Sequence, residues 1–408
     1  MWDQIETEHV HLETEKVKRL CDCARGREPV LTKVEVEPTD RCNLDCLFCW
    51  RQRDVDYDFD CELSEEKLLS MIRQSADLGA LEWRIGGGGE PMVRYATTIK
   101  MMAEIKRLGM MGALTTNGTI FSDDDVKSLI EIGWDYVEFS IDGPDAATND
   151  FLRGRKGAFD RSVKSLERFA RWKKHYGREK PALFLNTVVV NRNYDKLGRM
   201  LKMAKKYGMR EFSINPMTVF SPEVSFLKLD EAESERFQSM LPSFIEMARD
   251  FGIRNSLQDF LDVRIIRQTS DMKDLIQTYA GGDEDESAGE IGETEGEQAA
   301  AGDIPEFPSV KRMQDFLRLP CYDPWYLITI RGGKIAPCSG FLGTGLDPEG
   351  LSVEEIWFGE RQAAIRRDLE TGELPDYCKD CSSNMVARQK RLRGKMDHML
   401  LTGEYRMN

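Results

Sequence analysis

Short alternating segments and longer amphipathic segments follow one another along the first half of this 408-residue chain. In the short segments, apolar and polar residues alternate with the period of a β-strand, and in the longer ones apolar residues recur every three or four positions, as on one face of a helix. The predicted strands are 33–37, 81–85, 110–115, 136–141, 183–190 and 211–215. The predicted helices are 64–78, 96–108, one opening at Ser122, 160–176 and 194–207. Strands that alternate with helices predict a parallel sheet. Six repeats are fewer than the eight of a closed barrel, so we expect an α/β fold with a partial (β/α)6 TIM-like barrel.

The remaining sequence divides around that barrel by composition. The predicted units are an N-terminal helical extension 1–32, the barrel 33–229, a helical connector 230–280, an acidic insert 281–306 and a small C-terminal module 307–408. The insert has ten acidic and no basic residues, which predicts a mobile linker or, as an alternative, an acidic interaction segment. Without the insert, the net charge of −14 becomes −4, so the charge of the remaining residues is nearly balanced.

Composition excludes several other classes of protein. Hydrophobic residues make up 41% and charged residues 31% of the chain, as in globular proteins. No apolar run is long enough for a transmembrane helix, and the N-terminus lacks the basic and apolar regions of a secretory signal. The acidic balance argues against nucleic acid as a partner. We therefore expect a cytoplasmic protein with neither a membrane nor a nucleic-acid partner.

Ten cysteines form two groups and three leftovers, which in a reducing compartment indicates metal or redox chemistry. The first group, Cys42, Cys46 and Cys49, has C-x3-C-x2-C spacing directly after the first predicted strand. Three thiolates hold three corners of a cubane cluster and leave the fourth iron open to a ligand. A structural zinc loop is the alternative, although zinc prefers four protein ligands at structural sites.

The second group supplies four thiolates, which saturate either a cluster or a zinc ion. It consists of Cys321, Cys338, Cys378 and Cys381. Its first two cysteines flank a predicted hairpin with a Gly-Gly turn between 326–330 and 334–337, and a helix is predicted near 353–370. A unit this small has little core of its own and is often closed by a metal site.

The first cysteine loop and the repeats that follow it resemble the radical S-adenosylmethionine (radical SAM) superfamily over most of residues 33–217. The resemblance implies a 4Fe-4S cluster on the loop 42–49 and SAM beside it. It implies that Gly88, Gly89 and Glu90 receive the methionine amino group, that Ser140 and Asp142 contact the ribose, and that Arg153 meets the SAM carboxylate. Asn117 occupies a position of SAM or substrate contact. Taken alone, the glycine-rich turn would equally suit a phosphate or a plain tight turn.

The C-terminal group resembles the SPASM/twitch extensions, which hold auxiliary iron–sulfur clusters. A full SPASM pattern has about seven cysteines, whereas this module has four, so the resemblance implies one auxiliary 4Fe-4S cluster on those four. The alternative from another class is a zinc-stabilised binding protein with zinc in both cysteine groups.

The resemblance also implies the chemistry: SAM is cleaved reductively to a 5′-deoxyadenosyl radical, which abstracts hydrogen from a C–H bond. An external donor such as flavodoxin or ferredoxin would supply the electron. We expect a small polar substrate of sugar or cyclitol type, or alternatively a peptide. About 32 residues precede the first strand, which leaves no room for a leader-binding domain, and this favours a small molecule or a peptide that is bound without leader recognition. The outcome would be oxidation, or epimerisation with Cys61 as hydrogen donor, although a bystander cysteine is the simpler interpretation.

Polar residues on the predicted strands suggest where the substrate binds. They are Glu35, Glu37, Arg84, Glu138, Asn186 and Asn215. Because alternate residues of a strand point to one face, these side chains can line the barrel lumen. Ordinary solvated positions at strand ends are the alternative.

Overall fold

The computed structural model describes residues 4–49, 51, 62–219, 222–261, 310–336, 338, 345–372, 374–375, 378, 381 and 383–404. Two predictions fall outside these residues, namely the hydrogen-donor role of Cys61 and the acidic insert 281–306.

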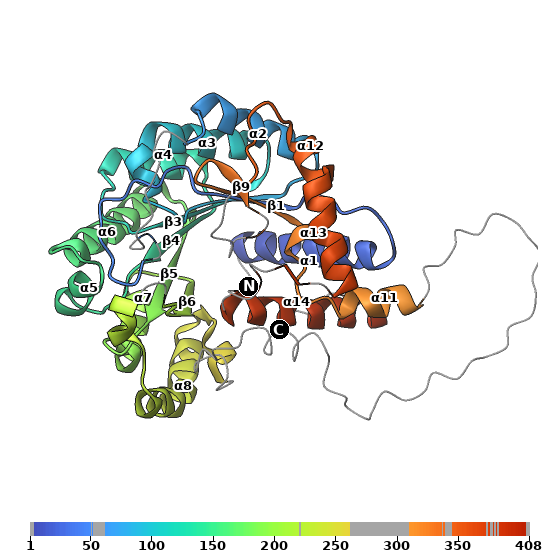
Figure 1. Cartoon of the computed structure of the whole chain (residues 1–408). Coiled ribbons are helices and arrows are strands. Elements are labelled where there is room, and N and C mark those ends of the chain that lie inside the picture. Colours follow the sequence, from blue (N-terminus) through green and yellow to red (C-terminus); the bar gives the residue numbers. More distant parts are fainter. Residues whose placement is uncertain are drawn as a thin grey trace, which may run out of the picture.

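A single curved sheet organises the described part of the chain, with strand order β7-β6-β5-β4-β3-β2-β1-β8-β9 (Figure 1). Strands β1 to β6 are parallel neighbours in sequence order. They span Lys33–Val36, Glu82–Ile85, Met111–Thr116, Tyr136–Ser140, Ala182–Val189 and Glu211–Pro216. This arrangement confirms the predicted α/β partial barrel, and each predicted strand matches an observed one within two residues at its ends.

Crossover helices cover the outer face of this sheet (Figure 1). They are α2 (Glu65–Asp77), α3 (Tyr95–Arg107), α4 (Asp123–Ile132), α5 (Ala146–Leu152), α6 (Ala158–Tyr176) and α7 (Leu197–Lys206). The hydroxyl of Ser64 accepts a hydrogen bond from Lys67 N, and Ser122 forms a capping box with Asp125. Such caps satisfy N–H groups that the first helical turn leaves unpaired. The predicted starts of these two helices are therefore confirmed.

The two faces of each barrel strand have different environments. On β1, Val34 and Val36 are buried against the helices, whereas Lys33 and Glu35 on the other face are half-buried. On β2, Trp83 is fully buried and donates from Nε1 to Ser75 Oγ at 2.9 Å. The apolar face forms the main core, so the polar face is left to line the lumen.

The C-terminal residues continue the barrel sheet. Strand β8 (Leu327–Arg331) pairs in parallel with β1, and β9 (Lys334–Ala336) pairs antiparallel with β8, which confirms the hairpin. The predicted helix near 353–370 is in fact two helices, α12 (Val353–Phe358) and α13 (Glu360–Thr371). Gly359 between them has ψ of 160°, which is extended backbone and breaks the helical path.

Two helices from opposite ends of the chain pack side by side at the open side of the curved sheet (Figure 1). They are α1 (Gln4–Ala24), within the predicted N-terminal extension, and α14 (Ser383–Thr402), which the sequence analysis missed. The other elements are α8 (Glu231–Phe251), β7 (Arg254–Asn255), α11 (Val310–Leu317) and short 3-10 helices at 91–94, 194–196, 222–227, 257–261 and 323–325. Among the described residues, no helix is long and apolar enough to cross a membrane. The domain boundaries stay predictions.

Candidate active site

The first cysteine loop rests on the end of helix α5. Asp45 N and Leu47 N donate to the carbonyls of Arg153 and Leu152, at 3.3 and 3.0 Å. Gly154, with φ of +64°, lies so close that a Cβ there would stand 2.0 Å from Asp45 O. Only glycine permits this approach, so the Arg153-Gly154 pair docks the loop that carries the cysteines.

The glycine-rich segment after β2 packs against the start of the same loop. Gly89 N donates to Thr39 O and Glu90 N to Arg41 O, at 2.9 and 2.8 Å. A Cβ on Gly89 would lie 2.1 Å from Arg41 O. Gly89 is therefore required by contact between two backbone segments, in addition to any ligand that it approaches.

Glu90 organises the end of β3 in this structure. Its carboxylate accepts hydrogen bonds from Asn117 N and Thr116 Oγ1, both at 2.7 Å, and from Met92 N at 3.1 Å. Burial raises the pKa of Glu90, and these donors oppose the rise. The Asn117 side chain donates to Asn43 Oδ1 at 2.9 Å, inside the cysteine loop. Sequence analysis missed Asn43, although its place directly after Cys42 was a signal.

Asp142 and Arg153 form a buried ion pair, with Arg153 Nε 2.6 Å from Asp142 Oδ2. Asp142 also accepts from Val188 N at 2.8 Å and is fully buried. Arg153 Nη1 lies 3.7 Å from Cys46 Sγ. Asp142 thus holds the arginine that faces the cysteines. The ribose contact predicted for Asp142 stays a prediction, because Asp142 does not line the cavity beside the cysteines.

The other predicted SAM residues meet around one cavity of about 300 Å³. Its lining includes Cys42, Cys46, Cys49, Gly88, Gly89, Glu90, Asn117, Ser140 and Arg153, and also Thr115. The nine cysteines that the structure describes are all free of disulfides. Burial raises the pKa of Cys46 to about 11, against the effect of Arg153. Thiolates in such a place require a compensating cation, so the donor set fits an iron–sulfur cluster with space for a ligand beside it.

The second cysteine group also converges on one cavity, which lies beneath α14. Cys321, Cys338, Cys378 and Cys381 line it together with apolar neighbours such as Leu369 and Val386. Burial raises the pKa of Cys378 to about 12, and it raises the pKa of Cys321 well above its ordinary value. Four desolvated thiols in an apolar wall fit a cluster that is fully ligated by protein. Among the described residues, no three His, Cys, Asp or Glu side chains are grouped to hold a single metal ion.

A third cavity, of about 540 Å³, occupies the barrel lumen beneath α1 and α14. We call it the lumen chamber. Twelve charged side chains line it: Glu13, Lys16, Lys33, Glu35, Glu82, Arg84, Glu138, Glu211, Asp259, Arg388, Arg391 and Lys395. Asn186 and Asn215 line it as well, so five of the six expected lumen residues are present. Glu37 is the exception: it turns towards the glycine-rich segment and pairs with Arg331 Nε at 2.8 Å.

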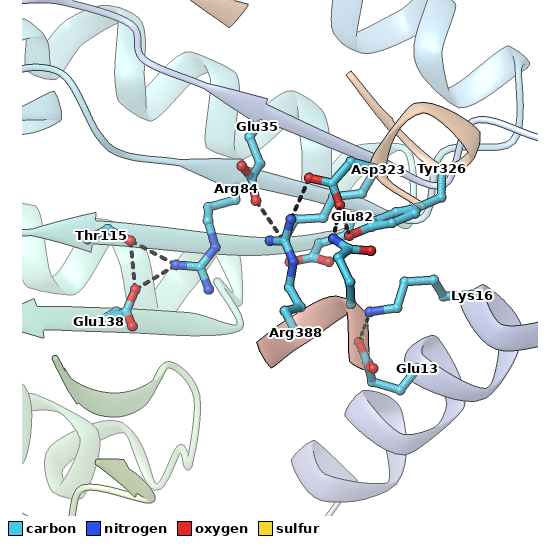
Figure 2. A network of polar contacts seen from close by, with 12 residues as sticks. Glu13, Lys16, Glu35, Glu82, Arg84, Thr115, Glu138, Asp323, Tyr326 and Arg388 are labelled. Atoms are coloured by element: carbon cyan, nitrogen blue, oxygen red, sulfur yellow. Dashed lines mark hydrogen bonds and ion pairs between the residues drawn. The ribbon is translucent and has the colours of Figure 1, made fainter. Parts of the chain in front are cut away.

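The lumen chamber adjoins the first cysteine cavity through three side chains, and Figure 2 shows the contacts between them. Arg84 Nη1 donates to Thr115 Oγ1 at 2.9 Å and to Glu138 Oε2 at 2.6 Å, and Thr115 Oγ1 donates to the same carboxylate at 2.8 Å. Thr115 lines the cysteine cavity, whereas Arg84 and Glu138 line the chamber. A ligand in the chamber would therefore lie one side-chain layer from a ligand beside the cysteines.

Curated relatives match parts of the chain. A protein of Pyrococcus furiosus called "Tungsten-containing aldehyde ferredoxin oxidoreductase cofactor-modifying protein" is 29% identical over 46% of this chain and 52% of its own length. The Fe-coproporphyrin III synthase of Methanosarcina barkeri is 38% identical over 36% of this chain and 35% of its own. The chain thus matches about half or less of these relatives.

A solved structure resembles the chain over most of its length, although its sequence is distant. Streptococcus suis SuiB bound to precursor peptide SuiA has a TM-score of 0.58 and 16% identity, covering 91% of this chain and 74% of that one. This likeness supports the fold. The family model described as the Radical SAM superfamily matches residues 36–204, which include the cysteine loop, the glycine-rich segment and Arg153. Residues 36–204 of this chain therefore form a radical SAM domain.

Proposed function

We propose that this protein is a radical SAM enzyme whose substrate binds in the lumen chamber. Cys42, Cys46 and Cys49 would hold the 4Fe-4S cluster that meets SAM. When bound, that cluster and SAM supply a 5′-deoxyadenosyl radical that removes hydrogen from a substrate C–H bond. The observation that carries the proposal is the contact between Thr115 on the cysteine cavity and Arg84 and Glu138 on the chamber.

The lining of the chamber indicates a polar, charged substrate. Only four apolar side chains, Ile214, Phe260, Met385 and Leu392, accompany the twelve charged ones in the described lining. A wholly apolar molecule would desolvate these charges without replacing their partners, which is costly. A peptide side chain or a small polar molecule offers hydrogen bonds instead. We therefore favour these two substrate classes, and the SuiB structure, which contains a precursor peptide, supports the first.

The chain's own residues would orient the substrate and limit side reactions. Asn215 Nδ2 donates to Asn186 Oδ1 at 2.5 Å, and Asn186 lies opposite Ser140 in the register of β4 and β5. Asn186 thus faces the chamber beside a residue of the cysteine cavity. Fixed polar groups at this junction would hold one C–H bond near the SAM cavity, and positioning of this kind is a major part of what the protein supplies.

Anaerobic reconstitution tests the proposal. The protein should bind about eight irons per chain, as two 4Fe-4S clusters require, and should form 5′-deoxyadenosine from SAM under dithionite. Cys46→Ala should lower the iron by about four and abolish that product. A colourless protein that contains zinc, or a Cys46→Ala variant that still forms 5′-deoxyadenosine, would reject the proposal.

The choice between oxidation and epimerisation rests on Cys61, which lies outside the described residues. If Cys61 returns hydrogen to the substrate, Cys61→Ala should stop product formation while 5′-deoxyadenosine still accumulates. If product forms unchanged, the donor role is excluded, and oxidation with the auxiliary cluster as electron acceptor becomes the reaction to test.

A further inference from the structure

Helix α14 places a row of cations along the lumen chamber. Arg388, Arg391 and Lys395 are spaced three and four residues apart, so they share one face of the helix. Arg391 is paired with Asp259, and Lys395 Nζ lies 3.5 Å from Glu13 Oε2. These two pairs link α14 to the 257–261 turn and to α1. Arg388 is at the end of the row near the second cysteine group, and its carboxylate partner is a fully buried residue, Asp323.

A buried carboxylate holds Arg388 from behind (Figure 2). Arg388 Nη2 lies 2.6 Å from Asp323 Oδ2, and Asp323 is fully buried. Asp323 Oδ1 also accepts from Gln389 Nε2 at 2.8 Å and from the Tyr326 hydroxyl at 2.9 Å. Three donors therefore fix Asp323, and Asp323 fixes the guanidinium. Arg388 thus carries a preorganised positive charge at the chamber wall.

The guanidinium keeps unused hydrogen-bonding capacity. Arg388 Nε is buried, and within the described part of the chain no atom accepts a hydrogen bond from it. A buried donor without an acceptor is unfavourable, so an acceptor supplied by a ligand would be gained at little cost. A carboxylate matches the forked geometry of a guanidinium better than a neutral acceptor does.

Arg388 also lies beside the second cysteine cavity. Met385 lines both that cavity and the lumen chamber, and Gln389 lines the cysteine cavity. Burial, the neighbouring thiols and Asp323 raise the pKa of Cys381, and the charge of Arg388 opposes that rise. The positive charge at the chamber wall therefore acts on the cysteines through a single layer of side chains.

We propose that Arg388 receives an anionic, carboxylate-type group of the substrate, and that the same charge sets the reduction potential of the cluster held by the four C-terminal cysteines. The inference rests on the proposed function, because it requires both that cluster and a substrate in the chamber. A positive charge near a cluster favours its reduced state. An anion that docks on Arg388 would cancel part of this charge and lower the potential, and by reciprocity reduction of the cluster would weaken anion binding.

Potentiometry on the full-length chain tests the charge. Cys42, Cys46 and Cys49 are all replaced by alanine, so that only the C-terminal cluster is reconstituted, and iron analysis should give about four irons per chain. Arg388→Gln in this background should lower the reduction potential of the C-terminal cluster. Electron paramagnetic resonance measures the fraction of reduced cluster at each applied potential. We expect the reduced-to-oxidised ratio at fixed potential to fall about tenfold, equivalent to about 59 mV for one electron. Because Arg388→Lys keeps the positive charge, its reduction potential should be close to that of the parent.

A matched control removes the same charge from an exposed position of the same helix. Lys390→Gln should leave the potential unchanged, since Lys390 is exposed to solvent. If Arg388→Gln binds four irons and has the parent potential, the charge role is refuted. If Lys390→Gln shifts the potential as much as Arg388→Gln does, the effect belongs to net charge and the inference fails.

Acetate tests the anion site, as a carboxylate probe compared with chloride at equal ionic strength. Acetate should lower the potential of the parent and should have no effect in Arg388→Gln. A shift that persists in Arg388→Gln, or no shift in the parent, overturns the anion role. If the triple-alanine protein binds zinc or no iron, the C-terminal cluster is absent and the inference fails at the iron analysis, whereas failure of the proposed function would appear separately as a parent protein that forms no 5′-deoxyadenosine.

Discussion

The two cysteine sites differ in what surrounds equally buried thiols. The first has three cysteines on one short loop, beside backbone amides, Asn117 and the Arg153–Asp142 pair, and a cavity of about 300 Å³. The second has four cysteines from segments up to 60 residues apart, enclosed largely by apolar side chains. A site that lacks one ligand but has polar surroundings suits binding, whereas a site with four ligands in an apolar wall suits storage or passage of an electron.

The lumen chamber lies between these two sites and shares a wall with each. Thr115, Arg84 and Glu138 separate it from the first, and Met385 separates it from the second. The two sites therefore differ in their number of cysteines and in their surroundings, while both share a wall with the chamber. The predictions below test this division.

Loss of a cysteine from the first site should have the largest effect. Cys46→Ala should reduce 5′-deoxyadenosine formation by more than the ~100-fold typical of losing an outer partner of a metal ligand. The measurement is product quantification by mass spectrometry under dithionite. Cys23→Ala, at a buried position on α1, is the matched control and should retain the activity. Equal losses in both variants would mean that the effect is on folding.

Loss of a cysteine from the second site should remove iron from that site alone. Cys381→Ala should remove about four irons while about four remain on the first loop. Since the four cysteines join α14 to the hairpin, hydrogen exchange should accelerate in α14 and not in α4. The division of roles fails if Cys381→Ala loses all iron, or if it loses none.

The buried ion pair behind the first site provides the third test. Arg153→Gln leaves Asp142 charged and buried, so the free energy of unfolding should fall by about 3–5 kcal/mol. Arg155→Gln, which removes an exposed pair with Asp45, should cost less than about 1 kcal/mol. The double variant Asp142→Asn, Arg153→Gln should recover part of the loss. Additive losses in the double variant would show that the two side chains do not act as a pair.

The smallest expected effect concerns pH. Burial raises the pKa of Glu37 from 4.5 to about 7, although Arg331 opposes the rise. The folded protein then holds a proton that the unfolded chain has already released, so stability falls as pH rises from 4.5 to about 7 and is level above that. Across pH 5.5 to 7 the loss is about 2 kcal/mol. In denaturant titrations, Glu37→Gln should remove this slope. A slope that is unchanged in Glu37→Gln would assign it to other groups.

Local sequence patterns predicted most of the barrel and of the first site. The strand from Lys33, the cysteine spacing and the glycine-rich turn each report on contacts within one or two neighbouring elements. Long-range pairings were not predictable in this way. The pairing of β8 with β1 joins residues almost 300 positions apart, and nothing local to either strand encodes it. The same holds for Glu90, which binds the end of β3 although its sequence context suggested a SAM contact.

Residue spacing alone predicts the alternation of strands and helices, the three-plus-four division of the cysteines and the polar face of the barrel strands. The tertiary structure adds that α1 and α14 lie across that polar face and, together with the strands, enclose twelve charged side chains in one chamber. It also decided that Arg388 stands between this chamber and the C-terminal cysteines. The physical reason is that charges act over distances in space, and a fold brings together charges that the chain keeps hundreds of residues apart.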